Sequence, residues 1–298
     1  MRVFVTGATG FIGSAVVQEL RGAGHQVLGL ARNEAAADAL ARLDVESHRG
    51  DLSDPASLAA GARACDGVIH TAFIHDFANI AASGVADLHA IEAFGAALEG
   101  SGKPLVVTSA VGHLPHGRVS TEDDLPDPGA AAKHRVASEA ATLAHAARGV
   151  RASLLRLPPS VHGEGDHGFV PALVGIARAK GVSATIEDGR NRWPAVHRLD
   201  AARLFRLALE KGVAGACYHG VADEGVPTRA IAEAIGRHLQ LPVVARSAAQ
   251  AAEHFGWLGR FFGADCPSSS ALTRERLGWR PEQPGLLADL DQGHYFAS

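Results

Sequence analysis

A glycine-rich stretch near the start of the chain has the spacing needed to bind a diphosphate. Residues 6–13 read Thr-Gly-Ala-Thr-Gly-Phe-Ile-Gly, directly after an apolar run and directly before a helical pattern. In this setting Gly7 permits a tight turn, Gly10 lets the backbone approach a phosphate, and Gly13 lets the helix pack closely on the strand. The positive end of the helix and its free N–H groups would then stabilise the anion. We therefore predict a dinucleotide site contacted by Thr6, Gly7, Thr9, Gly10, Phe11, Ile12 and Gly13.

The residues after the expected second strand bear on which dinucleotide binds. NAD-binding proteins usually carry a carboxylate there, which accepts a hydrogen bond from the ribose 2′-hydroxyl. This chain has Ala31-Arg32-Asn33 instead, and the Arg32 guanidinium could pair with a 2′-phosphate, unless it is simply a solvated surface arginine. We therefore predict NADP(H) in preference to NAD(H). Asp51 and Leu52, after the third strand, are predicted at the adenine, although Asp51 could equally cap the next helix.

Candidate proton donors lie after the expected fifth and sixth strands. Reduction of a carbonyl needs a donor within hydrogen-bond reach of its oxygen, and the carboxyl edge of a parallel sheet is where ligands bind. His113 and His116 follow the fifth strand, and His162 and His167 follow the sixth. A histidine titrates near neutrality, but the chain has sixteen of them, so a structural role is the alternative for each. We predict His113 and His162 as candidate acids and Ser109 as the group that orients the carbonyl.

The histidine spacing does not favour a metal site. The pairs 70/75, 113/116 and 162/167 lack the helical i,i+4 spacing with a nearby carboxylate that zinc enzymes use. We therefore expect no bound metal.

Short β-branched runs alternate with alanine-rich helical stretches through the first half of the chain. Such alternation predicts an α/β fold, a Rossmann-type doubly wound parallel sheet with helices on both faces. The expected strands are 3–6, 26–30, 45–48, 67–71, 105–108 and 152–155, and the expected helices are 12–23, 34–43, 55–64, 87–100 and 131–148.

The composition and the hydrophobic pattern of the sequence change after Pro158-Pro159. Glycine, proline and histidine become more frequent, and the strict alternation fades. We predict a dinucleotide-binding domain over residues 1–158. A smaller substrate-binding region is expected over residues 159–298, interleaved with the last strands of the sheet.

Composition and charge narrow the classes of partner. Hydrophobic residues make up 47% and charged residues 20%, which is typical of a globular protein, and the net charge of −4 gives no reason to expect nucleic acid or an anionic membrane. Cys65, Cys217 and Cys266 are too scattered for a disulfide framework or a zinc ribbon. The first strand follows Met1-Arg2 at once, and no apolar run is long enough to span a bilayer. We expect a cytoplasmic protein with a small-molecule substrate, and a homodimer is compatible with these features.

Several segments, in the same order along the chain, resemble the extended short-chain dehydrogenase/reductase family, also called the NAD-dependent epimerase/dehydratase family. The glycine turn at 6–13 and the Gly-Asp-Leu-Ser-Asp at 50–54 resemble the cofactor half of that family. Further matching segments are 68–72, 106–109, 155–163, 194–200 and 277–281. The resemblance implies cofactor contacts from Thr71, Ala72, Arg135 and Pro158.

The chain departs from this family at the acid–base group. The family carries Tyr-x-x-x-Lys, a tyrosine that exchanges the proton at the carbonyl and a lysine that lowers its pKa. The chain has two tyrosines, Tyr218 and Tyr295, and neither has a lysine four residues on. Alignment on Glu139 places Arg135 at the lysine position and Ala131 at the tyrosine position. The cofactor site is therefore expected to be intact while the proton donor is not the usual one.

These observations favour an NADP(H)-dependent oxidoreductase that acts on a small carbonyl or alcohol. Two alternatives remain open. One is a non-catalytic NAD(P)-binding sensor or regulator that lost turnover with the tyrosine. The other is a sugar-nucleotide epimerase or dehydratase, which would need the same missing base.

Overall fold

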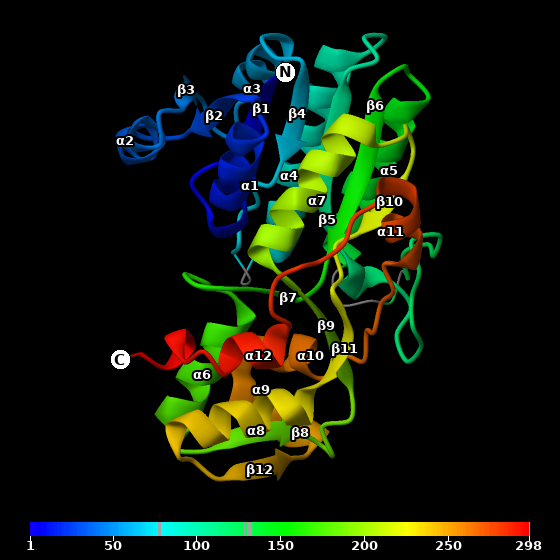
Figure 1. The fold of residues 1–298 in the computed structure, drawn as a ribbon. Coiled ribbons are helices and arrows are strands. Elements are labelled where there is room, and N and C mark those ends of the chain that lie inside the picture. The colour runs from blue at the N-terminus through cyan, green and yellow to red at the C-terminus, as the bar shows by residue number, and fades with distance from the viewer. Residues whose placement is uncertain (77–78, 128, 130–132, 298) are drawn as a thin grey trace.

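The central element of the molecule is a seven-stranded sheet in which every neighbouring pair is parallel (Figure 1). The computed structural model describes residues 1–76, 79–127, 129 and 133–297. The strand order is β10-β6-β5-β4-β1-β2-β3. The strands are β1 (Arg2–Thr6), β2 (Gln26–Ala31), β3 (Glu46–Arg49), β4 (Gly67–His70), β5 (Pro104–Ala110), β6 (Arg151–Leu157) and β10 (Cys217–His219). This topology confirms the predicted Rossmann-type α/β fold.

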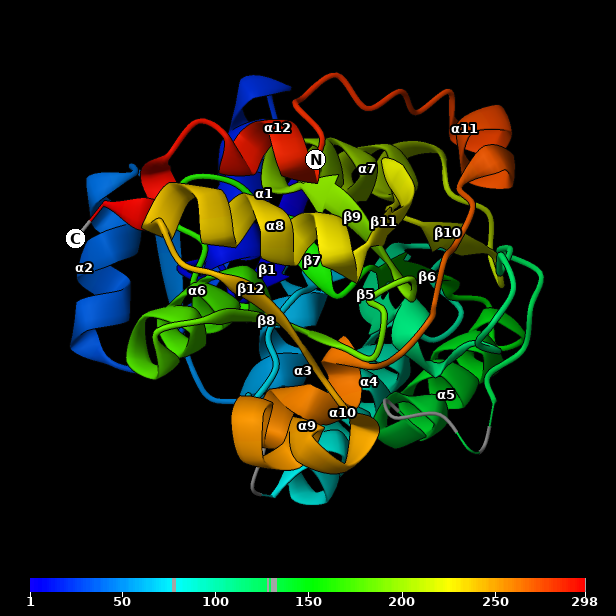
Figure 2. The same ribbon diagram turned by 90° about the horizontal axis from the view of Figure 1, so that it is seen from below.

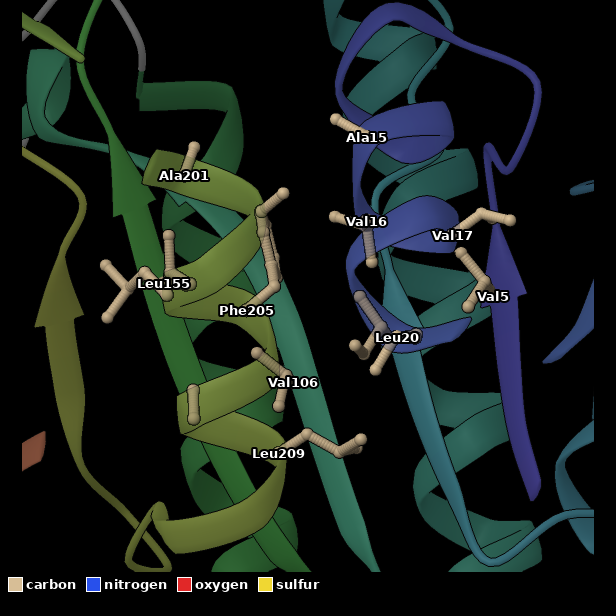
Figure 3. Close-up of a cluster of buried hydrophobic side chains, with 14 of the residues drawn as sticks. Val5, Ala15, Val16, Val17, Leu20, Val106, Leu155, Ala201, Phe205 and Leu209 are labelled. Atoms are coloured by element: carbon tan, nitrogen blue, oxygen red, sulfur yellow. The ribbon is translucent and has the colours of Figure 1, made fainter. Parts of the chain in front are cut away.

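Helices cover both faces of this sheet and bury two separate apolar clusters against it. On one face lie α1 (Phe11–Gly22), α2 (Glu34–Arg42) and α7 (Arg198–Lys211), and on the other lie α3 (Pro55–Arg63), α4 (Ile80–Leu98) and α5 (Val136–Ala146). Figure 3 shows how α1 contributes Val16 and Leu20, and α7 contributes Phe205 and Leu209, to the first cluster. Strands buried on both faces explain the continuous apolar runs in the sequence.

Two helices begin at positions other than those expected. Helix α4 begins at Ile80 rather than near Asp87. The sequence hides this start, because Ser83 and Gly84 have low helix propensity although both lie inside the helix. A Cβ at Gly84 would lie 2.7 Å from the backbone oxygen of His134, so this glycine allows a close approach between segments. Helix α5 begins at Val136 after a 3₁₀ turn at 133–135, and Ala131, where it was expected to begin, lies outside the described residues.

A second region lies at the carboxyl edge of the main sheet, with a core of its own (Figures 1 and 2). Its strands are β7 (Ser160–His162), β8 (Ser183–Ile186), β9 (Arg192–His197), β11 (Asp223–Pro227) and β12 (Val243–Arg246). Its helices are α6 (Phe169–Lys180), α8 (Thr228–Leu239), α9 (Ala248–Phe255), α10 (Gly259–Phe262) and α12 (Leu286–Leu290), whereas α11 (Ala271–Leu277) lies against β10. The chain crosses between the two regions more than once, since α7 and β10 belong to the main sheet layer. A division at residue 158 remains a prediction.

The described part of the chain contains no helix that is both long enough and apolar enough to cross a lipid bilayer.

Candidate functional site

The sheet has a switch point where ligands can enter. Strand β1 lies between β4 and β2, and from these two strands the chain continues toward opposite edges of the sheet. In open α/β sheets this arrangement leaves a crevice at the carboxyl ends of the two central strands. The loops after β1 and β4 therefore border the site.

The glycine turn after β1 has the close contacts that its sequence predicts. Gly7 has φ +68°, and a Cβ there would lie 2.8 Å from both the Ala72 nitrogen and Thr71 Oγ1. A Cβ at Gly13 would lie 1.9 Å from the Gly7 oxygen, so α1 could not approach the turn with any other residue. Gly10 is the N-cap of α1 in extended conformation, with φ −80°, and its added Cβ would be less crowded, 3.2 Å from the Gly7 oxygen.

The loop after β4 holds the glycine turn in place. Thr71 Oγ1 donates to the Thr6 oxygen at 2.7 Å, and the Ala72 nitrogen donates to Thr6 Oγ1 at 3.3 Å. The structure thus brings Thr71 and Ala72 against the glycine turn, and their contact with a cofactor remains a prediction.

The residues expected at the adenine end lie on the surface beside β2. Arg32 is exposed and makes no ion pair with any carboxylate in the described ranges, whereas its neighbour Arg49 pairs with Glu34. Asp51 Oδ1 accepts from the backbone nitrogen and Oγ of Ser53 at 2.9 and 2.7 Å, and these bonds lower the pKa of Asp51.

The helix cap that was the alternative role of Asp51 is provided by another residue. Asp54, the N-cap of α3, accepts from the backbone nitrogens of Ala56 and Ser57. Leu52 is partly buried against the apolar cluster that α3, α4 and α5 form with the sheet. Asp51 is therefore exposed beside Arg32 without serving as the N-cap.

A buried polar chain links the glycine turn to Arg135. Thr6 Oγ1 lies 2.7 Å from His70 Nδ1, and His70 Nε2 lies 3.2 Å from Asp87 Oδ1. Arg135 Nη1 donates to the two oxygens of Asp87 at 3.4 and 3.5 Å and to the Thr108 oxygen at 3.2 Å. Burial acts to raise the pKa of Asp87, but the hydrogen bond from His70 and the charge of Arg135 outweigh it, so the pKa is lowered. Asp87 is therefore a fixed anion that orients Arg135.

An aromatic ring covers the guanidinium of Arg135. The guanidinium carbon lies 3.7 Å from the ring centre of Phe73, and the rings of His75 and His134 lie 5.3 and 5.6 Å from the same ring. Burial, followed by the charge of Arg135, lowers the pKa of both histidines, that of His134 to about 4. Both are therefore neutral near pH 7. Their spacing in the sequence carried no signal for this cluster, although His134 directly precedes Arg135.

The predicted catalytic residues Ser109, in β5, and His113, in the 3₁₀ turn Val111–His113 that follows it, are both buried. Ser109 is 4% exposed and His113 is fully buried. His113 Nε2 lies 2.9 Å from Glu139 Oε1, and Glu139 also accepts from Nε and Nη2 of Arg156 at 2.9 and 2.8 Å. Burial acts to raise the pKa of Glu139, but the bonds from Arg156 and His113 outweigh it and hold the pKa at about 2. Neither Ser109 nor His113 faces solvent in this structure.

The residues predicted after β6 are divided between the interior and the surface. Pro158 is buried directly after the strand, and His162 is fully buried, with Nδ1 2.9 Å from Asp289 Oδ2. The His162 ring meets the His197 ring edge to face at 5.4 Å. His167 is exposed and lies 5.8 Å from the ring of Phe11.

The family model for the NAD dependent epimerase/dehydratase family matches residues 3–220. The chain belongs to this family. It is similar to an uncharacterized protein of Schizosaccharomyces pombe, 50% identical over 298 residues, which covers 99% of this chain and all of that protein. It is also similar to a 4-hydroxy-2-methyl-3-oxo-4-farnesyl-3,4-dihydroquinoline-1-oxide ketoreductase of Stigmatella aurantiaca, 26% identical over 86% of this chain and 80% of that enzyme. Among solved structures, a dTDP-glucose 4,6-dehydratase of Streptomyces venezuelae with NAD bound has a TM-score of 0.78 at 22% identity, over 99% of this chain and 98% of that chain.

This member of the epimerase/dehydratase family has no tyrosine free to act as its base. Tyr218 is 1% exposed, and its hydroxyl accepts from the Val213 nitrogen at 3.0 Å. The hydroxyl of Tyr295 accepts from the Gly163 nitrogen and donates to Asp166 Oδ2, both at 3.0 Å. Burial, followed by the charge of Asp166, raises the pKa of Tyr295. Both hydroxyls are therefore occupied by structural hydrogen bonds.

No group of three or more histidine, cysteine, aspartate and glutamate side chains that could hold a metal occurs in the described part of the chain.

Proposed function

We propose that this protein is an NADP(H)-dependent oxidoreductase that reduces a small carbonyl compound or oxidises the corresponding alcohol. The observation that carries the proposal is the combination of a closely packed glycine turn with an exposed Arg32, directly after β2, that forms no ion pair in the described part of the chain. The turn suits the diphosphate of any dinucleotide, and the arginine suits the 2′-phosphate found only in NADP(H). Similarity to a ketoreductase supports the reaction class.

The residues at the switch point fit the cofactor. A Cβ at Gly7 or Gly13 would collide with neighbouring backbone, so these glycines allow the tight turn and the close approach of α1. The N-terminal N–H groups of α1 would then face a diphosphate. Arg135 is held at the carboxyl edge by Asp87 and Phe73, where its remaining N–H groups are available to ribose hydroxyls or to a polarised oxygen. When bound, NADP(H) supplies or accepts the hydride.

The proton donor is the open part of the proposal. Ser109, His113 and His162 remain our candidates from the sequence, and each would have to become accessible, since none is exposed by more than 4%. His134 joins them as a neutral imidazole whose N–H can donate a hydrogen bond to a substrate oxygen, since its ring packs beside the Phe73 ring that covers Arg135. General acid catalysis contributes roughly 10²- to 10⁴-fold, so loss of the true donor is expected to reduce turnover by about that factor and to leave cofactor affinity nearly unchanged.

The test begins with cofactor binding and then examines turnover. The affinities for NADPH and NADH are measured by titration, and a panel of ketones, aldehydes and 3-oxo compounds is screened for loss of NADPH absorbance. Ser109→Ala, His113→Ala, His162→Ala and His134→Ala are then assayed on any responsive substrate. Equal affinities, or tighter binding of NADH, would reject the NADP(H) preference. Tight binding of NADPH without its oxidation in the presence of any substrate would reject the proposal that the protein is an enzyme.

That second outcome would favour a non-catalytic NAD(P)-binding sensor, which one observation supports. Both tyrosines of the chain are committed to structural hydrogen bonds, as expected if turnover had been lost. A sugar-nucleotide epimerase or dehydratase is also compatible with the family, but it needs the same base. Incubation with a nucleoside diphosphate sugar and NAD, followed by chromatography of the products, distinguishes it from both.

The setting of this activity is also part of the proposal. Cys65, Cys217 and Cys266 are free thiols, which suits a cytoplasmic protein. The net charge of −4 suits a small-molecule substrate rather than nucleic acid. Assembly as a homodimer is compatible with the fold and can be measured by light scattering.

A further inference from the structure

Helices α1 and α7 lie side by side and begin at the same edge of the sheet (Figures 1 and 3). Near their far ends, Arg206 Nε of α7 lies 2.7 Å from Glu19 Oε1 of α1. Beyond the end of α1, His25 Nε2 lies 2.9 Å from Glu210 Oε1. These contacts hold the two helices parallel. The first residue of α7 is therefore a neighbour of the first residue of α1, where the diphosphate is proposed to bind.

That first residue of α7 is an arginine without a carboxylate partner among the residues that the structure describes. The guanidinium carbon of Arg198 lies 5.2 Å from the ring centre of Phe11, and Phe11 directly follows Gly10, the N-cap of α1. Arg198 is half-buried, and it forms no ion pair within the described ranges. By contrast, Arg203 and Arg206 of the same helix pair with Glu282 and Glu19. Partial burial of a charge is costly unless an anion pairs with it, so the position of Arg198 indicates a negatively charged ligand.

A second basic side chain reaches Phe11 from the loop after β7. The ring of His167 meets Phe11 edge to face at 5.8 Å. The loop that carries His167 is anchored at both ends, because Tyr295 bonds to the Gly163 nitrogen and to Asp166, and Asp166 Oδ1 accepts from the Gly168 nitrogen at 2.7 Å. Arg198 thus approaches the start of α1 from α7, and His167 approaches it from a loop of the second region that these hydrogen bonds hold in place.

We propose that Arg198, assisted by His167, binds the diphosphate of the dinucleotide from the side opposite the glycine turn. This inference rests on the proposed cofactor site and assigns a residue from outside the glycine turn to cofactor affinity. Because the diphosphate is common to NADP(H) and NAD(H), Arg198 affects both equally. Arg32, in contrast, is expected to distinguish the two.

The experiment measures binding of NADPH, NADH and ADP to the full chain by titration calorimetry. Arg198→Met keeps an unbranched apolar stem against Phe11 while removing the charge. A charge-assisted hydrogen bond is worth enough for Arg198→Met to weaken all three ligands by about 10- to 100-fold, with the ratio of NADPH to NADH affinity unchanged. Arg198→Lys, which keeps a point charge, is expected to recover most of the loss.

Two matched variants serve as controls. Arg203→Met removes the same charge from the same helix, where the partner is Glu282, and is expected to leave all three affinities unchanged. Arg32→Met is expected to weaken NADPH alone. Thermal unfolding of each variant without ligand shows whether the fold is retained, and if Arg198→Met is unstable, Arg198→Gln replaces it.

The possible failures are distinguishable. If the unaltered protein binds none of the three ligands, the proposed cofactor site itself is wrong. If it binds them and Arg198→Met binds them equally well, the assignment of Arg198 is wrong and its contact with Phe11 is packing alone. If Arg198→Met leaves the three affinities intact but raises the KM of an anionic substrate, Arg198 binds substrate, which also overturns the proposal.

Discussion

The carboxylate of Asp87 interacts with both His70 and Arg135, and the residue is buried from solvent. Removing one partner of a buried pair leaves the other charge uncompensated, which costs about 3–5 kcal/mol. We therefore expect Asp87→Ala to lower the free energy of unfolding by about that amount. Urea denaturation followed by circular dichroism measures it.

The matched control for Asp87 is an exposed pair on a helix. Arg229 and Glu233 are four residues apart in α8 and largely exposed, and pairs of this kind contribute about 0.3–0.5 kcal/mol. Glu233→Ala should therefore have a small effect. If Asp87→Ala cost no more than Glu233→Ala, the buried chain from Thr6 to Arg135 would not contribute to stability.

His219 makes a prediction about pH. Burial, followed by the charge of Arg156, lowers the pKa of His219 to about 3, below the ordinary value of 6.5. Between these two values the unfolded chain binds a proton that the folded protein does not. Stability must then fall as pH falls below 6.5, by about 1.4 kcal/mol per pH unit from this residue.

The variant that tests this pH dependence is His219→Asn. His219 Nδ1 lies 2.9 Å from the Ser269 oxygen, and an asparagine amide can donate to the same oxygen without titrating. The free energy of unfolding, measured from pH 7 to pH 5, should therefore fall less steeply in His219→Asn than in the unaltered protein. Identical slopes would show that the imidazole is not held neutral in the fold.

For single residues, the sequence shows which residue types occur and in which order, but it does not show which residues contact one another in the fold. Arg32 and Arg135 were identifiable because they occupy positions where a carboxylate or a lysine is usual. Asp87 and His134 were not, since the contacts that matter to them are with residues far away in the chain. The burial of His113 and His162 was equally hidden, because a histidine that pairs with Glu139 or Asp289 has no distinguishing neighbour in sequence.

At the scale of elements, the turn between β1 and α1 separates two uses of glycine. A Cβ at Gly10 would lie 3.2 Å from the Gly7 oxygen, a contact that a small shift relieves, whereas a Cβ at Gly13 would lie 1.9 Å from the same oxygen. Gly10→Val is therefore expected to keep the fold and to abolish binding of either dinucleotide. Gly13→Ala is expected to displace α1 and to lower the unfolding temperature as well. Thermal unfolding and cofactor titration of both variants check this, and normal NADPH binding by a folded Gly10→Val protein would contradict the proposed phosphate site.

The elements themselves were predictable wherever hydrophobic period and turn residues agreed. Strand β2 and helix α3 begin where the apolar pattern and the proline at residue 55 predict. The start of α4 was not predictable, because glycine is typical of helix ends and the packing of Gly84 against His134 depends on the tertiary structure. Local propensity was overridden there by the need for close approach.

At the scale of the whole molecule, the sequence indicated the second region only by a change in composition and by the loss of the strand-helix alternation. One of its two sheets joins β7, β9 and β11 and the other joins β8 and β12. These segments are separated by long stretches of chain, and pairing over such distances leaves no periodic signal. Its relation to the cofactor edge depends on contacts such as His162 with Asp289 and Gly163 with Tyr295. These connect residues more than 120 positions apart.

The same contacts predict how cofactor binding spreads through the molecule. If Arg198 and His167 bind the diphosphate, NADPH joins the glycine turn at 7–13 to the loop at 163–168, which Tyr295 anchors. A ligand stabilises the conformations that it binds, so NADPH should slow hydrogen exchange of backbone amides in both segments. In His167→Ala, at a concentration of NADPH that saturates the protein, protection should remain in the turn and be lost from the loop. Equal protection of the loop in both proteins would show that NADPH joins the two regions without His167.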